Sequence, residues 1–213
     1  MNVQLVSFAL VPDHIYTAEK YFHTDKLILI LSEENKEKMD ETSLEVEFKI
    51  KEIQKFYEKL NVSTDLIYVD YKDFMQMTSK LVKLLKKFSN DDFILLNLSG
   101  GRRSIPIALI YAGIIISNFK RMNIKCVVIP EDKSYTPFDL LPKYFPDEID
   151  IKLMSKITEN LTLTDLEDFL KIKQPTISIR LKKLEEYGYV IVKGRNRDLT
   201  DLGKVVVNII SPD

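Results

Sequence analysis

Two adjacent glycines and two adjacent arginines are the residues whose types and spacing best suit a chemical task. Gly100, Gly101, Arg102 and Arg103 follow the apolar run FILLNLS and precede a long apolar segment at 104–119. Glycines let backbone amides approach an anion closely, a helix N-terminus adds positive potential, and arginines form charge-assisted hydrogen bonds. This corner therefore predicts a phosphate-binding site. The alternative is a tight turn with two solvated arginines.

Several other chemistries have no support in the sequence. The dinucleotide fingerprint GxGxxG and the P-loop GxxxxGK[ST] are both absent, which argues against an NAD site and a nucleoside triphosphatase. The single cysteine, Cys126, lies in the apolar run IKCVVIP, and His14 and His23 lie nine positions apart without metal-ligand spacing. We therefore predict no disulfide, no metal and no cofactor.

The whole-chain totals are those of an ordinary globular protein. Of 213 residues, 45% are hydrophobic and 30% charged, and 31 Lys and Arg stand against 32 Asp and Glu. Any affinity for nucleic acid must therefore come from local clustering of charge. The first residues lack the pattern of a signal peptide, and the apolar segment 105–119 is shorter than the about 20 residues of a spanning helix. We expect a cytoplasmic protein that does not engage a membrane.

Residues 1–130 alternate β-rich and helical segments. Strands are expected at 3–10, 26–32, 65–70, 93–99 and 124–130, and helices at 14–22, 43–60, 74–88 and 104–119. Strands that are apolar on both faces and separated by helices favour a parallel sheet covered on both sides. The predicted fold class is therefore α/β with a Rossmann-like, mainly parallel sheet. Ligands of such sheets bind beyond the carboxyl ends of the strands, which is where the corner at Gly100 falls.

The pattern changes after residue 130. Pro137, Pro142 and Pro146 predict an interdomain linker at 131–149, followed by a smaller domain at 150–213. Its helices are expected at 149–159, at 162–172 with Thr164 as the cap, and at 174–188 with Gly188 as the stop. A strand at 189–193, a turn at 194–197 and a last helix or strand at 205–210 are expected to follow.

The helix expected at 174–188 carries a basic surface. Ile177, Leu181 and Leu184 recur at helical spacing and are expected to face inward, which leaves the polar side chains outward. Between Lys171 and Arg197, eight basic residues stand against two acidic ones, a local charge of +6. Such clustering on an otherwise neutral chain predicts contact with the phosphates of nucleic acid.

The stretch TISIRLKKLEEYGYVIVKGRNRDLTDLG resembles the winged helix-turn-helix of MarR and ArsR type regulators. The resemblance implies that the helix enters the major groove of double-stranded promoter DNA and that the wing at 193–197 contacts phosphate or the minor groove. The implied DNA-binding residues are Lys173, Gln174, Thr176, Ser178, Arg180, Lys182, Lys183, Lys193, Arg195, Asn196 and Arg197. The alternative is that the winged helix serves only for protein contacts or dimerisation.

The stretch LNLSGGRRSIPIAL, followed later by a winged helix, resembles the CARF family of CRISPR-associated Rossmann-fold sensors, within it the winged-helix regulators of archaeal CRISPR loci. The family loop D-x-T-G-G-T-[KR]-x-M corresponds to residues 97–105, with asparagine in place of the acid and arginine in place of the second hydroxyl. The resemblance covers nearly the whole chain. It implies a homodimer that binds a cyclic oligoadenylate, commonly cyclic tetra-adenylate, across a two-fold axis.

The same resemblance implies which residues bind the ligand. They are Leu10, Val11, Pro12, Asp13 and His14 after the first strand, and Asn97, Ser99, Gly100, Gly101, Arg102, Arg103 and Ser104 after the fourth. Asp13 has an alternative role as the cap of the first helix. Asp73, after the third strand, is expected to be a helix cap rather than a ligand contact.

The combined expectation is a ligand-responsive transcription regulator. Binding of the oligoadenylate would change how two winged helices address a palindromic promoter, with the linker transmitting the change. The alternative is a metal-independent ring nuclease that cuts the ring by in-line attack of a ribose hydroxyl. Its candidate catalytic residues are Arg102, Arg103, Ser99 and Ser104. A third interpretation is a binding module whose winged helix only dimerises.

Overall fold

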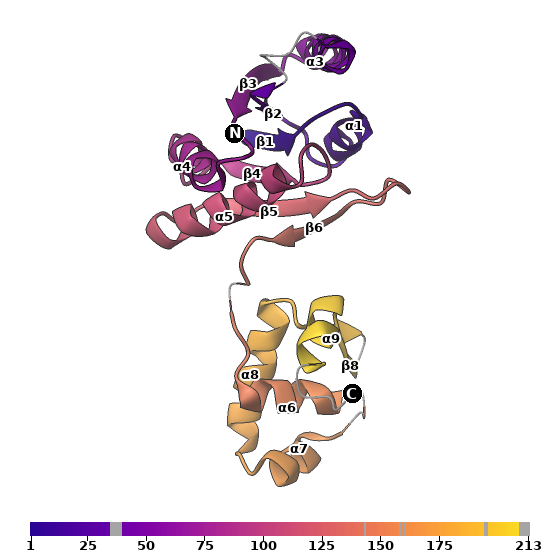
Figure 1. Cartoon of the computed structure of the whole chain (residues 1–213). Helices are drawn as coiled ribbons and strands as arrows, with labels where there is room; N and C mark the ends of the chain where they lie inside the picture. The colour runs from indigo at the N-terminus through magenta and orange to yellow at the C-terminus, as the bar shows by residue number, and fades with distance from the viewer. Residues whose placement is uncertain (35–39, 143, 158, 160, 194–195, 209–213) are drawn as a thin grey trace. The chain divides into compact units, whose positions relative to one another are not determined.

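A computed structural model describes the chain at residues 1–34, 40–142, 144–157, 159, 161–193 and 196–208 (Figure 1). The chain divides into two compact units, Met1–Leu141 and Pro142–Asp213. Each unit has a hydrophobic core of its own, so each is described by itself.

The first unit is built on one six-stranded sheet. Its strands are β1 Asn2–Ser7, β2 Lys26–Ser32, β3 Ser63–Val69, β4 Phe93–Asn97, β5 Asn123–Val128 and β6 Thr136–Asp139. They lie in the order β3-β2-β1-β4-β5-β6, in which the first five are parallel and β6 runs antiparallel to β5. The prediction of an α/β fold with a mainly parallel, Rossmann-like sheet is confirmed.

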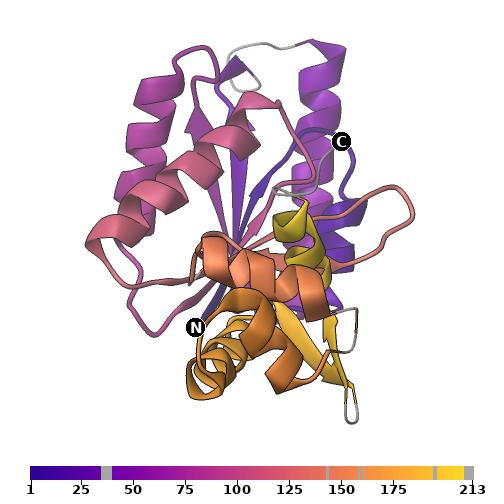
Figure 2. The ribbon, with the colours of Figure 1, turned by 90° about the horizontal axis from the view of Figure 1, so that it is seen from below.

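Helices cover both faces of this sheet (Figures 1 and 2). The helices α1 Asp13–Glu19 and α3 Glu41–Lys59 pack on one face, and α4 Phe74–Leu85 and α5 Ser104–Phe119 on the other. Successive side chains of a strand point to opposite faces. In β2, Ile28 and Ile30 therefore join the core beneath α4 and α5, whereas Leu27, Leu29 and Leu31 join the core beneath α1 and α3.

The strand order places a crevice where two loops diverge. β2 and β3 extend the sheet on one side of β1, whereas β4 and β5 extend it on the other. The chain therefore leaves β1 and β4 in opposite directions at this switch point, which is where open α/β sheets bind ligands.

The Asp73 side chain accepts a hydrogen bond of 2.9 Å from the Gln76 amide at the start of α4, so its prediction as a helix cap is confirmed.

The segment predicted as a linker, 131–149, contains a strand. β6 pairs with β5 through Thr136 and Val128 at one end and Asp139 and Lys125 at the other. Pro137 lies within β6, and an edge strand tolerates proline because one side of its backbone makes no ladder hydrogen bonds. The prolines indicated an interruption where the structure has an edge strand, and the first unit extends to Leu141.

The second unit consists of helices and a hairpin. Its elements are α6 Glu148–Ile157, α7 Leu163–Leu170, α8 Gln174–Glu186, β7 Val190–Lys193, β8 Asn196–Leu199 and α9 Asp201–Val207. Ile177, Leu181 and Leu184 of α8 are buried, as their spacing predicted, together with Leu153 and Tyr189. The turn residues 194 and 195, Arg195 among them, lie outside the described residues.

Two helix boundaries in this unit follow local signals. Thr162, rather than the predicted Thr164, caps α7, because Asp165 stands three residues after Thr162 and the two side chains form a reciprocal capping box. α8 ends at Glu186, and Gly188 follows with a φ of +76°, the left-handed conformation that favours glycine after a helix.

No helix in the described part of the chain is both long and apolar enough to span a membrane.

Candidate functional site

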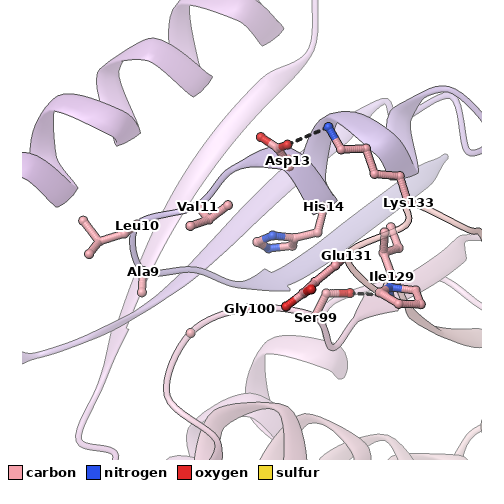
Figure 3. A pocket seen from close by; sticks show the side chains of 12 residues that line it. Ala9, Leu10, Val11, Asp13, His14, Ser99, Gly100, Ile129, Glu131 and Lys133 are labelled. Atoms are coloured by element: carbon pink, nitrogen blue, oxygen red, sulfur yellow. Dashed lines mark hydrogen bonds and ion pairs between the residues drawn. The ribbon is translucent and has the colours of Figure 1, made fainter.

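A pocket of about 510 Å³ lies at the carboxyl ends of the central strands (Figure 3). Three loops form it, which follow β1, β4 and β5. Its lining residues are Ala9, Leu10, Val11, Asp13, His14, Ser99, Gly100, Gly101, Ile129, Pro130, Glu131 and Lys133. Seven of the twelve residues predicted after β1 and β4 therefore come together at one pocket, whereas the other five do not line it: Pro12, Asn97, Arg102, Arg103 and Ser104. The contribution of the loop after β5 was not predicted.

The two glycines are required by the packing of the loop after β4. A Cβ atom on Gly100 would lie 2.6 Å from Nε2 of His14 and 2.7 Å from the carbonyl oxygen of Ser7. Gly101 has a φ of +75°, and a Cβ atom there would lie 2.0 Å from Oγ of Ser7. Any side chain at either position would separate this loop from the end of β1.

Asn97 and Ser99 connect the loops to one another. The buried Asn97 donates from Nδ2 to the carbonyl oxygen of His14 at 3.0 Å and accepts from the Ser99 amide at 3.2 Å. Oγ of Ser99 accepts from the amide of Ile129 at 2.7 Å. Both residues were predicted as ligand contacts, and in the structure they join the loops after β1, β4 and β5.

His14 is a buried polar residue of the pocket. Its side chain is buried, lies against Gly100, and its Nε2 atom has no hydrogen-bond partner (Figure 3). Oγ of Ser7, beneath Gly101, is also buried and without a partner. Buried polar atoms without a hydrogen-bond partner are costly to a fold.

Burial lowers the pKa of His14 below its ordinary value of 6.5, so the folded state keeps the ring neutral while the unfolded state takes up a proton near that pH. Stability of the first unit is therefore expected to fall as the pH is lowered through and below 6.5, by at most about 1.4 kcal/mol per pH unit. Thermal melts between pH 7.5 and 5.5 measure this slope. His14→Gln should remove it and His23→Gln, at an exposed histidine, should not; an unchanged slope in His14→Gln would contradict the assignment.

The residues that follow Gly101 contact other loops than those that form the pocket. Nη2 of Arg102 forms an ion pair with Glu34 at 3.0 Å, and its guanidinium lies 4.4 Å from the ring centroid of Tyr71. Oγ of Ser104 donates to the carbonyl oxygen of Tyr71 at 3.2 Å. Arg102 and Ser104 therefore join the loop after β4 to the loops after β2 and β3, and neither lines the pocket.

Arg103 and Asp13 occupy helix starts. Arg103 is exposed at the N-cap position of α5, and no ion pair of its side chain exists among the described residues. Pro12 holds the N-cap position of α1, so Asp13 is the first helical residue and not the cap. The Asp13 carboxylate instead pairs with Lys133 at 2.8 Å across the pocket (Figure 3).

The loop after β5 is the part of the pocket that sequence reasoning missed. Ile129, Glu131 and Lys133 line the pocket from this loop. The sequence predicts a strand end and a linker for this segment, although the run IKCVVIP ends at the same edge of the sheet as the glycine corner. No local pattern in the sequence shows that β5 lies next to β4, and only this strand pairing brings the loop to the pocket.

The basic surface of the second unit is partly paired. Lys173, Thr176, Lys182, Lys183, Lys193, Asn196 and Arg197 are exposed, whereas Gln174, Ser178 and Arg180 are half-buried. Nη1 of Arg180 contacts Asp147 at 2.9 Å and the buried Asp150 at 2.7 Å, which ties α8 to the start of α6. Lys193 pairs with Asp198 and Arg197 with Glu185.

No group of histidine, cysteine, aspartate and glutamate among the described residues is arranged to hold a metal ion.

An open, doubly wound sheet with a pocket over its switch point defines a Rossmann-like α/β domain. Residues 18–136 match the family model described as the Csa3 CRISPR-associated Rossmann-like domain, and the chain belongs to that family. The predicted membership among CRISPR-associated Rossmann-fold proteins is confirmed. Among curated proteins no match was found.

Solved structures similar to this chain at low identity include the following two. Can2 from Sulfobacillus thermosulfidooxidans, in complex with cyclic tetra-adenylate, has 9% identity and a TM-score of 0.48 over 97% of this chain and 64% of that chain. Csm6 from Enterococcus italicus, bound to cyclic hexa-2′-fluoro-hexa-dAMP, has 14% identity and a TM-score of 0.49 over 87% of this chain and 52% of that chain. The chain thus spans less than two thirds of the length of either.

Proposed function

We propose that the first unit is a sensor domain that binds a cyclic oligoadenylate in the pocket at the switch point. The observation that carries the proposal is the loop of Gly100 and Gly101, which lines that pocket and brings backbone without side chains to its surface. Membership of the CRISPR-associated Rossmann-like family supports the ligand class. The proposed contacts are the predicted residues Leu10, Val11, His14, Ser99, Gly100 and Gly101, which line the pocket, with Arg103 as the exposed cation at the start of α5.

The proposal includes a homodimer. A ring of phosphodiesters such as cyclic tetra-adenylate has two-fold symmetry, so two copies of the pocket can bind it across a two-fold axis. One protomer then supplies half of the contacts, and neither half-site is complete without the other.

The second unit is proposed to be a winged helix that binds promoter DNA. Its order of α6, α7, α8 and the β7–β8 hairpin supports α8 as the helix that enters the major groove, with the hairpin as the wing. The exposed residues of the basic surface are its proposed contacts, with Gln174, Ser178 and Arg195. Arg180, held by Asp147 and Asp150, is assigned to positioning α8.

Cleavage of the ring is a second candidate function, which one observation favours. The pocket contains a neutral histidine and a lysine, His14 and Lys133, and the glycine corner by itself offers neither. A ribose 2′-hydroxyl that attacks the adjacent phosphorus displaces the 5′-oxygen and needs one group to take a proton and another to stabilise negative charge. A neutral imidazole and an ammonium group are the types of group that fill those two roles.

The experiment that tests the first proposal is incubation of the full chain with radiolabelled cyclic tetra-adenylate, followed by a native gel and by chromatography. Intact bound ligand supports the sensor, and linear products support cleavage. Absence of binding in the gel and in calorimetry contradicts the proposed ligand. A promoter gel shift with and without the ligand then tests whether occupancy changes DNA affinity.

The DNA-binding surface makes its own prediction. Lys182 is exposed on α8, so Lys182→Ala should weaken promoter binding and lower the dependence of log affinity on log salt by about one for each phosphate that the lysine neutralises. Lys55→Ala, which removes an exposed lysine from α3, is the matched control and should change neither quantity. Gel shifts at four salt concentrations measure both. Identical slopes for Lys182→Ala and Lys55→Ala would remove α8 from the interface.

A further inference from the structure

The charged side chains that line the pocket do not favour the binding of an anion in their present arrangement. Asp13 and Glu131 bring two negative charges to the lining, and Lys133 is the one lysine or arginine among the described lining residues. A phosphodiester is stabilised by positive charge and repelled by carboxylates. Binding of a phosphate ligand in this pocket therefore depends on the availability of Lys133.

Lys133 is held by an acid of the same pocket. Its Nζ atom lies 2.8 Å from Oδ2 of Asp13, and the two side chains are 58% and 55% exposed. The lysine also holds the pKa of Asp13 below its ordinary range, so the carboxylate is ionised at neutral pH. An ion pair this exposed contributes less than about a fivefold change in an equilibrium constant. The carboxylate can therefore be replaced on the lysine by another anion at little cost in free energy.

The loop that carries Lys133 is anchored by contacts other than this ion pair. The ring of Tyr21, just after α1, stacks on Tyr135 with centroids 4.6 Å apart and planes 12° apart. The Ile129 amide donates to Ser99 at 2.7 Å, and the Lys133 amide donates to Pro130 at 3.0 Å. The lysine side chain can therefore change its partner while the backbone stays in place.

We propose that Lys133 is the anion-binding cation of the pocket and that Asp13 occupies its ammonium group until a phosphodiester of the ligand replaces the carboxylate. The inference rests on the proposed function, since it specifies how that site recognises its ligand. Asp13 then acts as an internal competitor that raises the concentration of ligand needed for occupancy.

The test is a set of affinities for cyclic tetra-adenylate, with inorganic tripolyphosphate measured in parallel as a generic polyanion. Lys133→Ala should weaken binding about ten- to a hundredfold, because it removes a charge-assisted hydrogen bond. Lys55→Ala, which removes a lysine from the exposed face of α3, should weaken it less than about twofold. Asp13→Asn should tighten binding about two- to fivefold.

A double variant separates competition for Lys133 from simple repulsion of the ligand. If Asp13 acts by holding the lysine, the gain from Asp13→Asn disappears when Lys133 is already alanine. Glu131→Gln is the matched control, because it removes the same charge from the same pocket without an ion pair to Lys133. Its effect should be equal with and without Lys133. A gain from Asp13→Asn that persists in the double variant overturns the role of Asp13.

The two probes distinguish failure of the inference from failure of the proposed function. Binding of cyclic tetra-adenylate that Lys133→Ala leaves unchanged overturns the inference and leaves the sensor. Binding of tripolyphosphate alone, abolished in Lys133→Ala, supports the anion site and contradicts the proposed ligand. No binding of either probe overturns both.

Discussion

Replacement of Gly101 by alanine is expected to destabilise the first unit by about 3 kcal/mol and to abolish binding of cyclic tetra-adenylate. Two costs add together. The φ of +75° is unfavourable for any residue with a Cβ atom, and that atom would lie 2.0 Å from Oγ of the buried Ser7. The loop must move away from β1 to relieve the contact, and the backbone that lines the pocket moves with it.

Gly188→Ala is the matched control for this prediction. Gly188 has a φ of +76°, almost the same as Gly101, but nothing lies within 4 Å of a Cβ atom built there. Its substitution should therefore cost only about 1 kcal/mol, in the second unit, and leave the pocket intact. Hydrogen exchange of the full chain assigns each decrease in stability to its own unit. Equal decreases for the two variants would show that the close approach to Ser7 is not what requires glycine.

Replacement of Asp150 by alanine is expected to destabilise the second unit by about 3 kcal/mol and to weaken DNA binding with it. Asp150 is buried and accepts from Arg180 at 2.7 Å and from the hydroxyl of Tyr144. Its removal leaves Arg180 with Asp147 alone and breaks an ion pair between α6 and α8. Because α8 is the proposed recognition helix, a change in its position should also lower promoter affinity.

The control for Asp150 is an exposed acid on the same helix. Glu148 pairs with Lys152 at 2.6 Å, and its side chain is 76% exposed, so Glu148→Ala should change stability by less than about 0.5 kcal/mol. Hydrogen exchange in α6 and α8, together with a promoter gel shift, measures both variants. A decrease in stability in Asp150→Ala no larger than that in Glu148→Ala would mean that the buried ion pair does not hold these helices together.

The elements of the first unit were predictable because each depends on local pattern. Short runs that are apolar on both faces and alternate with helical segments favour strands of a covered parallel sheet, and α5 was predicted with the bounds that the structure has. β6 was missed because Pro137 is read from the sequence as a break, and only its place at the sheet edge makes it tolerable. The cap of α7 was displaced from Thr164 to Thr162 because Asp165 forms its box with the earlier threonine.

The candidate site was predictable to the level of its loops. Gly100 and Gly101 indicate a close backbone approach by their type alone, and both line the pocket. The partners of the neighbouring charges were not predictable. Arg102 pairs with Glu34 and stacks on Tyr71, which lie after other strands, and Asp13 is paired with Lys133, which belongs to a loop four strands later in the sequence.

The sequence by itself determined the class of fold, the glycine corner and the basic face of α8, because periodicity, glycine and local charge need no partner to be recognised. Only the tertiary structure decided which side chains share the pocket and which charges are already paired. The physical reason is that pairing depends on strand order. Parallel strands bring the ends of β1, β4 and β5 to one edge, and no local pattern states that β5 lies next to β4.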